Sequence, residues 1–348
     1  MPRNPSTQAP RRLDRLADNT LLALRFKDLP VSIESSNLND RLHQLHNELA
    51  ERRITLKPHA WLSDEWFAPT DVPGIALPFY LAHPRLIRLE RRMMLEAEGA
   101  TREACMKLLR HEAGHCVRVA YNLQRRRAWQ NTFGSAAKPY PVSYKPRPYS
   151  RAFVQHLDNY YAQAHPDEDF AETFAVWLTP GYNWRRRYAR WPALNKLEYV
   201  DRLMREIAGK KPQTRSRKRI APIERLDTTL AEHYDARRAA YGVDQPDIYL
   251  RDLRALFTPK DHAPRGSTNA AAALRKHRRP LVRAVARWTN QYPYTIDTIY
   301  NAMTERCHAD DLRVPPGTDR DALHANIASL LTVLAMNEIQ TGGRRIRI

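Results

Sequence analysis

Leu108 to Val117 reads L-L-R-H-E-A-G-H-C-V and lies in a run whose apolar residues recur at helical spacing. His111 and His115 are four residues apart, so on a helix their imidazoles share one face, about one turn apart. Two imidazoles on successive turns can bind one metal ion, and zinc favours such nitrogen ligands. Glu112 follows the first histidine, where it can act as general base on a metal-bound water. The alternative is a buried amphipathic helix that carries two histidines by chance.

The composition is that of a globular protein with a strong positive charge. The 348 residues leave room for one large or two modest domains, and 43% are hydrophobic and 27% charged. The formal net charge of +19 and the pI near 10.1 are extreme. A nucleic-acid, anionic-surface or acidic-protein partner is therefore a candidate, bound through the basic surface.

Cysteine usage and the apolar segments indicate the cellular compartment of the protein. The three cysteines, Cys105, Cys116 and Cys307, form no paired spacing, which favours a reducing compartment. Residues 1–20 contain no apolar segment of the kind found in a secretory signal. The longest apolar run, Leu330 to Met336, is too short to cross a bilayer. We expect a soluble cytoplasmic protein with no membrane partner.

A small sheet is predicted before the histidine helix. Residues 54–62 and 74–82 are rich in β-branched and aromatic residues, and a turn containing proline and aspartate at 69–73 separates them. This pattern predicts a small antiparallel sheet. Ile75 to Tyr80 is the candidate edge strand that would receive a substrate in extended form. Pro78 suits an edge strand better than a central one.

The histidine helix is followed by a stretch rich in proline, tyrosine and basic residues. Thr101 is expected to cap the helix, which is expected to run to about Arg126. Residues 128–150 contain too many prolines for regular structure and too many aromatic residues for a plain linker. Two interpretations remain open: a loop packed over the core by its tyrosines, or a wall of a substrate cleft.

A second helix is predicted to complete the metal site. Pro166 and the carboxylates behind it make a well-formed helix start, and catalytic zinc usually takes three protein ligands. Glu168 is the candidate third ligand, because a helix N-terminus favours the ionised carboxylate that a metal needs. Glu172, one turn on, can accept an N–H from a ligating imidazole. Cys116 lies beside His115 on a different helix face and is a poor ligand. The alternative for both glutamates is a solvated charge near the helix start.

These residues carry a resemblance to known peptidases. H-E-A-G-H, followed by Tyr161 and by E-D-F-A-E-T-F at 168–174, resembles the zincin peptidases of the anthrax lethal factor and Pro-Pro endopeptidase type, whose ligand helix reads E-F-F-A-E-x-F. The resemblance implies that Glu168 binds zinc, that Glu172 supports the site and that Tyr161 points into it. Asp169 departs from the pattern, since the family has an aromatic residue there.

A second resemblance covers a longer stretch. Residues 59–202 are similar to an uncharacterised bacterial family of zinc-binding metallopeptidases, on the phrases H-P-D-E-D-F-A-E-T-F-A-V-W-L at 165–178 and L-S-D-E-W-F at 62–67. The family implies peptidase chemistry and brings no substrate with it. The C-terminal half carries no resemblance to a named family.

Together these elements predict an α+β, mainly helical fold. We expect a disordered or loosely docked basic arm at 1–20 and a zincin-like metallopeptidase domain with the small antiparallel sheet at 21–209. A basic linker at 210–220 and an all-helical domain of unknown role at 221–348 are expected to follow. The helices expected in the last part are Ile223–Tyr241, Ile248–Phe257, Ala270–Thr289, Thr295–Cys307 and Asp319–Gln340.

The leading hypothesis is a zinc-dependent metallopeptidase of the gluzincin kind, acting on a protein or peptide. Zn2+ would be held by His111, His115 and Glu168, and Glu112 would take the proton of the attacking water and pass it to the leaving amine. Tyr161 would hydrogen-bond the developing oxyanion. The alternative is a basic nucleic-acid-associated binding or regulatory protein whose zincin module is not catalytic.

Overall fold

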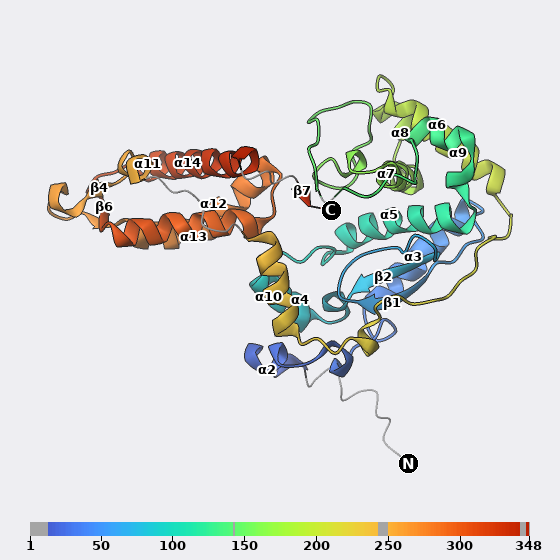
Figure 1. Cartoon of the computed structure of the whole chain (residues 1–348), viewed down its shortest axis with the longest axis horizontal. Coiled ribbons are helices and arrows are strands. Elements are labelled where there is room, and N and C mark those ends of the chain that lie inside the picture. Colours follow the sequence, from blue (N-terminus) through green and yellow to red (C-terminus); the bar gives the residue numbers. More distant parts are fainter. Residues whose placement is uncertain (1–12, 142, 243–249, 342–345, 348) are drawn as a thin grey trace, which may run out of the picture. The chain divides into compact units, whose positions relative to one another are not determined.

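The computed structural model describes residues 13–141, 143–242, 250–341 and 346–347. The chain divides into two compact units, residues 1–234 and 235–347 (Figure 1). Helices dominate both units and the sheets are small, so the predicted mainly helical α+β class is confirmed. Among the described residues, no helix is both long and apolar enough to span a membrane.

The first unit is organised around α5 (Arg102–Ala120), which is buried along most of its length. The hydroxyl of Thr101 accepts the N–H of Ala104 at 3.1 Å, which confirms the predicted cap. The helix ends at Ala120 rather than near Arg126. Asn122 adopts a left-handed conformation (φ 51°) that ends the α-helical turns, and the 3-10 turn η4 (Leu123–Arg125) follows.

Two other helices pack on α5 from different sides (Figure 1). One is α7 (Pro166–Leu178) and the other is α3 (Leu38–Glu51). α5 and α7 cross where small residues face each other, because a Cβ added at Gly114 would lie 2.8 Å from the Cα of Ala171. Only glycine permits so close an approach of the two backbones. The crossing brings the histidine face of α5 against the first turns of α7.

The sheet of the first unit consists of β1 (His59–Ser63) and β2 (Gly74–Pro78), and the two strands are parallel. The prediction that these segments pair antiparallel is therefore wrong. Residues 64–73 between them do not form a tight hairpin turn; they carry the chain back to the level of His59 before β2 begins. The composition located both strands, although the predicted segments at 54–62 and 74–82 are longer than the strands observed. Their direction depends on the path of this connection.

The other edge of β2 is also bonded. Phe67, in the connection between the strands, pairs antiparallel with Ala76, whose N–H donates to the Phe67 carbonyl at 2.8 Å. All residues of β2 are buried. β2 is an edge strand of its two-stranded sheet, as predicted, but Phe79 and Tyr80 of the predicted segment belong to a 3-10 turn and its outer edge is bonded at Ala76. Its role as the strand that receives a substrate stays a prediction.

The N-terminal arm of the prediction is partly described. Residues 1–12 lie outside the described residues, but Leu13 is buried, and Asp18 forms ion pairs with Arg85 and Arg92 of α4 (Pro84–Met93). Residues 13–20 are thus docked on the first unit.

Residues 210–219, which we call the basic strap, run along the first unit. The backbone N–H groups of Gln213 and Thr214 donate to the Ala120 carbonyl at 2.8 and 3.1 Å. Just beyond, the indole N–H of Trp61 donates to the Ile220 carbonyl at 2.8 Å. The strap is therefore fixed through its backbone, and its basic side chains are exposed: Lys210, Lys211, Arg215, Arg217, Lys218 and Arg219. The domain boundaries expected from composition stay a prediction.

The remaining helical elements of the first unit are α2 (Asp18–Leu22), η2 (Phe26–Asp28), η3 (Phe79–Ala82), α6 (Arg127–Phe133), η5 (Tyr161–Gln163), α8 (Trp184–Arg187), α9 (Ala193–Ile207) and η6 (Ile223–Arg225). A short strand, β3 (Ser143–Tyr144), lies in the stretch rich in proline and tyrosine. α10 (Leu230–Tyr241) begins in the first unit and ends in the second.

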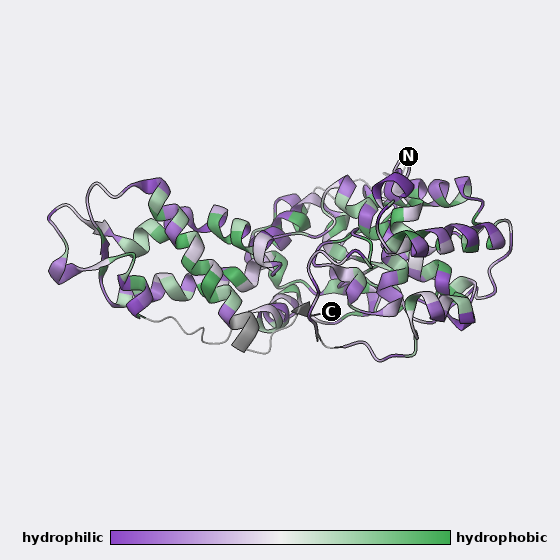
Figure 2. Cartoon of the chain, turned by 90° about the horizontal axis from the view of Figure 1, so that it is seen from above, coloured by the Kyte–Doolittle hydropathy of each residue, from purple (hydrophilic) through white to green (hydrophobic). Residues whose placement is uncertain are grey.

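The second unit contains three long helices, α12 (Ala270–Thr289), α13 (Pro293–Ala309) and α14 (Arg320–Thr341), which pack on one another. Figure 2 shows both hydrophobic and hydrophilic residues on these helices, as expected for helices that bury one face. The prediction of an all-helical region is wrong in one detail: β4 (Thr258–Pro259), β6 (Leu312–Val314) and β5 (Thr268–Asn269) form a small antiparallel sheet. The other elements are α11 (Leu250–Arg254), η7 (Lys260–His262) and β7 (Ile346–Arg347).

Candidate metal centre

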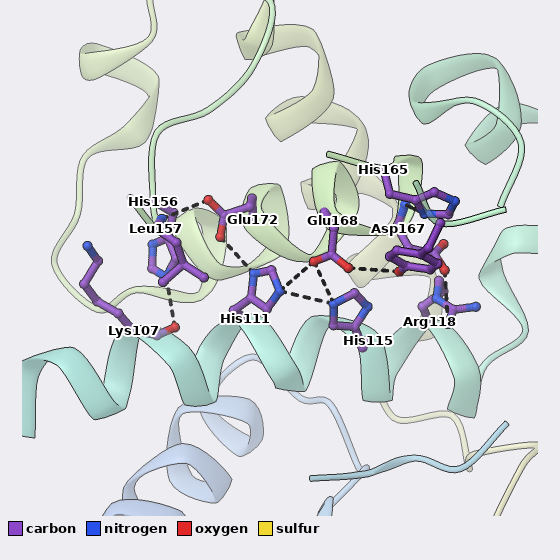
Figure 3. Close-up of polar contacts among 11 residues, drawn as sticks. Lys107, His111, His115, Arg118, His156, Leu157, His165, Asp167, Glu168 and Glu172 are labelled. Atoms are coloured by element: carbon purple, nitrogen blue, oxygen red, sulfur yellow. Dashed lines mark hydrogen bonds and ion pairs between the residues drawn. The ribbon is translucent and has the colours of Figure 1, made fainter. Parts of the chain in front are cut away.

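Three side chains meet where α5 and α7 cross (Figure 3). Oε2 of Glu168 lies 2.9 Å from Nε2 of His111 and 3.2 Å from Nε2 of His115, and the two nitrogens are 3.1 Å apart. All three residues are buried. Within the described part of the chain, this is the one group of His, Cys, Asp or Glu side chains whose ligand atoms lie close enough, within 4.8 Å of one another, to hold a metal ion.

Glu172 fixes the orientation of His111. Nδ1 of His111 donates to Oε1 of Glu172 at 2.8 Å, and the backbone N–H of Leu157 donates to Oε2 of the same carboxylate at 2.8 Å (Figure 3). Both oxygens of Glu172 are thus occupied, and Glu172 supports His111 without being one of the three clustered side chains. With its Nδ1 proton given to Glu172, His111 has Nε2 left to bind a metal ion at the point where Nε2 of His115 and Oε2 of Glu168 also lie.

The start of α7 explains why Glu168 faces the histidines. Nδ1 of His165 accepts the N–H of Asp167 at 3.1 Å and caps the helix, and Pro166 occupies its first turn. Proline is preorganised for this position. Glu168 therefore lies in the first turn, where the helix dipole favours the ionised carboxylate.

Tyr140 is a member of the site that the sequence did not single out. Its hydroxyl donates to Oε1 of Glu168 at 2.9 Å, which leaves Oε2 as the oxygen that faces the histidines. The Tyr140 ring is stacked on His165, with the ring centroids 3.9 Å apart. Nε2 of His165 donates to the Lys138 carbonyl at 2.9 Å, so the loop is attached to the start of α7 at two points. No periodic spacing links position 140 to 168, so the sequence offered only the aromatic character of the loop.

The prediction that residues 128–150 lack regular structure is wrong for the first of them, which belong to α6, and for the short strand β3. The loop at 134–150 combines both interpretations that the sequence left open. Tyr144 is buried, and its hydroxyl donates to the Asn159 carbonyl at 2.7 Å, as expected of a packed loop. Tyr140 reaches the cluster itself. Tyr149 is 79% exposed and takes no part in either role. The loop thus packs on the core and also borders the candidate site.

The electrostatics of the cluster favour positive charge between the histidines and Glu168. Burial lowers the pKa of His111, but the hydrogen bonds to Glu168 and Glu172 outweigh it and raise this pKa well above its usual value. Burial raises the pKa of Glu168, but the charges and hydrogen bonds of His115 and His111 hold it well below its usual value. Two buried carboxylates thus stabilise a cation at the imidazoles, and a divalent metal ion is such a cation.

Glu112 and Tyr161 lie beside the three clustered side chains. Glu112 is buried, and burial raises the pKa of its carboxyl, with the charges of His111 and His115 acting in the opposite direction. The ring of Tyr161 lies 5.6 Å from the ring of His111, centroid to centroid. Burial and the negative charge of Glu168 raise the pKa of Tyr161 well above its usual value, so its hydroxyl keeps its proton. The catalytic roles of both residues stay predictions.

Asp169, the departure from the family pattern, is directed away from the site. Its carboxylate forms an ion pair with Nζ of Lys196 on α9 at 2.6 Å. Burial raises the pKa of Asp169 to about 7, and Lys196 acts against this shift. Asp169 therefore helps to hold α7 on α9 and is not one of the clustered side chains.

Two imidazole nitrogens and one carboxylate oxygen, presented by an H-E-x-x-H helix and a second helix, are the ligand set of the His2Glu zinc peptidases. Residues 89–180 match the model of a family described as "putative zinc-binding metallo-peptidase". The matched segment contains the whole cluster, and the match confirms the resemblance to the bacterial family seen in the sequence. None of the curated proteins and none of the solved structures matches the chain.

Proposed function

We propose that the protein is a zinc-dependent metallopeptidase that hydrolyses a protein or peptide substrate. The observation that carries the proposal is the convergence of His111, His115 and Glu168 on one buried point inside the segment that matches the metallopeptidase family. The family match supports metallopeptidase character, and the geometry of the cluster supports the proposed metal, ligands and mechanism.

The residues fit a zinc ion in three respects. The three ligand atoms come from different side chains and lie within 4.8 Å of one another. The hydrogen bond from His111 to Glu172 holds the tautomer whose free nitrogen can bind a metal. The hydrogen bond from Tyr140 occupies the outer oxygen of Glu168. Zinc held by these residues would supply a Lewis acid and lower the pKa of a coordinated water toward about 7.

Glu112 is the residue proposed to move the proton. It follows His111 on α5, and its carboxylate is buried beside the cluster. A buried carboxylate with a raised pKa can accept a proton from the attacking water and then donate it to the amine of the leaving group. Glu112 would do so without binding the metal.

Tyr161 is the residue proposed to stabilise the charge that develops on the carbonyl oxygen of the scissile bond. Its ring lies beside His111, and its hydroxyl remains a donor because its pKa is raised. A preorganised donor near a developing oxyanion typically contributes about 10²- to 10³-fold to turnover.

The alternative is a nucleic-acid-associated binding protein with a non-catalytic zincin module. A non-catalytic zinc site would need His111, His115 and Glu168, which pair with one another, but not Glu112, whose carboxylate is buried beside them. The cluster therefore favours the enzyme. The three cysteines are buried and unpaired, in keeping with the proposed cytoplasmic location.

Elemental analysis and one substitution test the proposal. Protein purified without added metal should contain about one zinc per chain, and it should cleave members of a peptide library in a chelator-sensitive way. Glu112→Gln should retain zinc and fold while hydrolysis falls by about 10²- to 10⁴-fold. A protein that neither contains zinc nor takes it up at neutral pH would overturn the assignment, and unchanged turnover of Glu112→Gln would remove that residue from the mechanism.

A further inference from the structure

The long helix α12 of the second unit carries a row of arginines that the proposed peptidase activity does not use. Arg275, Arg279, Arg283 and Arg287 recur at every fourth position, and all four are exposed. Residues four apart follow one ridge of a helix, so we call this set the arginine ridge. At a rise of 1.5 Å per residue, the ridge extends over about 18 Å.

The charge of the ridge is not neutralised within the described structure. α12 contains no acidic residue. Its one ion pair among the described residues is that of Arg278 with Asp297, and Arg278 lies outside the ridge. Four exposed cations that make no ion pair repel one another, and binding an anionic partner would relieve that repulsion.

An exposed aromatic residue lies at the end of the ridge. Trp288 is 80% exposed, the largest exposure among the large hydrophobic side chains of the described residues. The guanidinium carbon of Arg287 lies 5.8 Å from the centroid of the Trp288 ring. Proteins that bind single-stranded nucleic acid combine exposed aromatic side chains, which stack on bases, with basic side chains, which contact phosphates. The exposed tryptophan and the arginine ridge provide this combination.

The opposite face of α12 argues against a lipid surface as the partner. Leu274, Val282 and Val285 are buried in the second unit. An interfacial membrane helix inserts its apolar face into the headgroup region, and here that face is already used for packing. An acidic protein would satisfy the charges but would leave the exposed indole unexplained.

We propose that α12 binds a single-stranded nucleic acid, with the arginine ridge on successive phosphates and Trp288 stacked on an unpaired base. The surface lies in the second unit and does not depend on the proposed zinc chemistry. The protein would then carry a peptidase unit and a nucleic-acid-binding unit in one chain.

Fluorescence anisotropy of the full-length protein with a labelled mixed-sequence 20-nucleotide DNA and its RNA equivalent tests the proposal. In single strands, each phosphate contact contributes about 0.7 to the slope of log affinity against log salt. Changing all four ridge arginines to glutamine should therefore reduce the slope by about 3. Trp288→Ala should weaken binding to the single strand by about 5- to 150-fold and leave binding to a duplex of the same sequence nearly unchanged.

A matched control removes the same charge elsewhere. Lys211→Gln, Arg215→Gln, Arg217→Gln and Lys218→Gln, combined in the exposed basic strap, should leave the slope close to that of the wild type. Tyr149→Ala serves as control for Trp288, because Tyr149 is 79% exposed. Circular dichroism verifies that each variant is folded.

Three results would overturn the proposal: no binding of either single strand at about 50 mM salt, an equal loss of slope in the strap control, or competition by poly-L-glutamate as effective as that by the oligonucleotide. The last would identify an acidic polypeptide as the partner. None of these results bears on zinc content or peptide hydrolysis, so the proposed function stands or fails separately.

Discussion

The two units of the chain differ in whether their charged side chains are buried or exposed. In the first unit, ion pairs with buried carboxylates lie around α5 and α7. They join Arg110 to Glu48 at 2.7 Å, Arg118 to Asp167 at 3.4 Å and Lys196 to Asp169 at 2.6 Å. In the second unit, as far as it is described, Asp297 with Arg278 is the one ion pair with a buried partner. The arginine ridge of that unit faces water.

The buried charges of the first unit belong to a candidate site, whereas the exposed charges of the second unit form a surface. Burying a charge costs free energy that an ion pair only partly offsets, so a concentration of buried charge needs a reason other than stability. In the first unit that reason is the cluster at the helix crossing. In the second unit the apolar faces hold the helices together, and the charges remain available to a partner in solution.

The sharpest test of this comparison removes a buried carboxylate from each unit. Glu168→Ala should abolish stoichiometric zinc binding, because two imidazoles alone leave the metal short of a protein ligand. Asp297→Ala removes a comparable carboxylate and should leave the zinc content unchanged while lowering the stability of the second unit. Elemental analysis after gel filtration measures the zinc content of both variants. Retention of zinc by Glu168→Ala would mean that another residue supplies the ligand.

The second test concerns turnover. Tyr161→Phe keeps the ring and its packing beside His111 but removes the proposed oxyanion donor, so turnover should fall by about 10²- to 10³-fold with zinc retained. Tyr160→Phe is the matched control and should be close to wild type. Equal rates for the two variants would leave the oxyanion role without a residue.

The third test uses the tyrosine that the sequence did not single out. Tyr140→Phe removes the hydrogen bond to Oε1 of Glu168 and should weaken zinc affinity by about 10- to 100-fold, as loss of a bond to a ligand typically does. Tyr144→Phe removes the hydrogen bond from the same loop to the Asn159 carbonyl, which is not part of the cluster. This variant should leave zinc affinity unchanged. Competition with a chromogenic chelator measures both, without any substrate. Equal affinities would show that the bond from Tyr140 does not position Glu168.

The smallest effect is expected at the helix crossing. Gly114→Ala places a Cβ against the Ala171 backbone, and overpacking of this kind costs about 1–3 kcal/mol. Hydrogen exchange should become faster in peptides from α5 and stay unchanged in peptides from α12. Faster exchange in the peptides of both helices would show that the two units unfold together. The units would then differ in where they place charged side chains but not in their stability.

The centre of the site could be predicted because its spacing follows from helix geometry. His111 and His115 are one turn apart on any helix, and the proline with its acidic turn marks where α7 begins, so Glu168 could be proposed as the third ligand. Tyr140 could not, because it reaches Glu168 from a loop whose path no periodicity fixes. Its aromatic neighbourhood was visible in the sequence, but its contact was not.

The sheet shows the same limit. Residue composition located β1 and β2, since β-branched and aromatic residues mark strands wherever they pair. The direction of pairing is set by residues 64–73. They contain a local turn at 70–71 but return the chain to the level of His59, so the strands run parallel and the antiparallel prediction failed. The end of α5 was also misplaced, because a left-handed asparagine ends a helix without any change in hydrophobic pattern.

The bond between Phe67 and Ala76 has a consequence for inhibitor chemistry. Peptidomimetics that gain affinity by adding a strand to an enzyme's sheet need a row of free backbone donors and acceptors. In β2 the edge opposite β1 is already bonded at Ala76, and the strand is buried. We expect a strand-mimicking backbone to gain little there. On the proposed zinc mechanism, inhibitors would draw affinity from a metal-chelating group and from contacts with the tyrosine-bearing loop that borders Glu168.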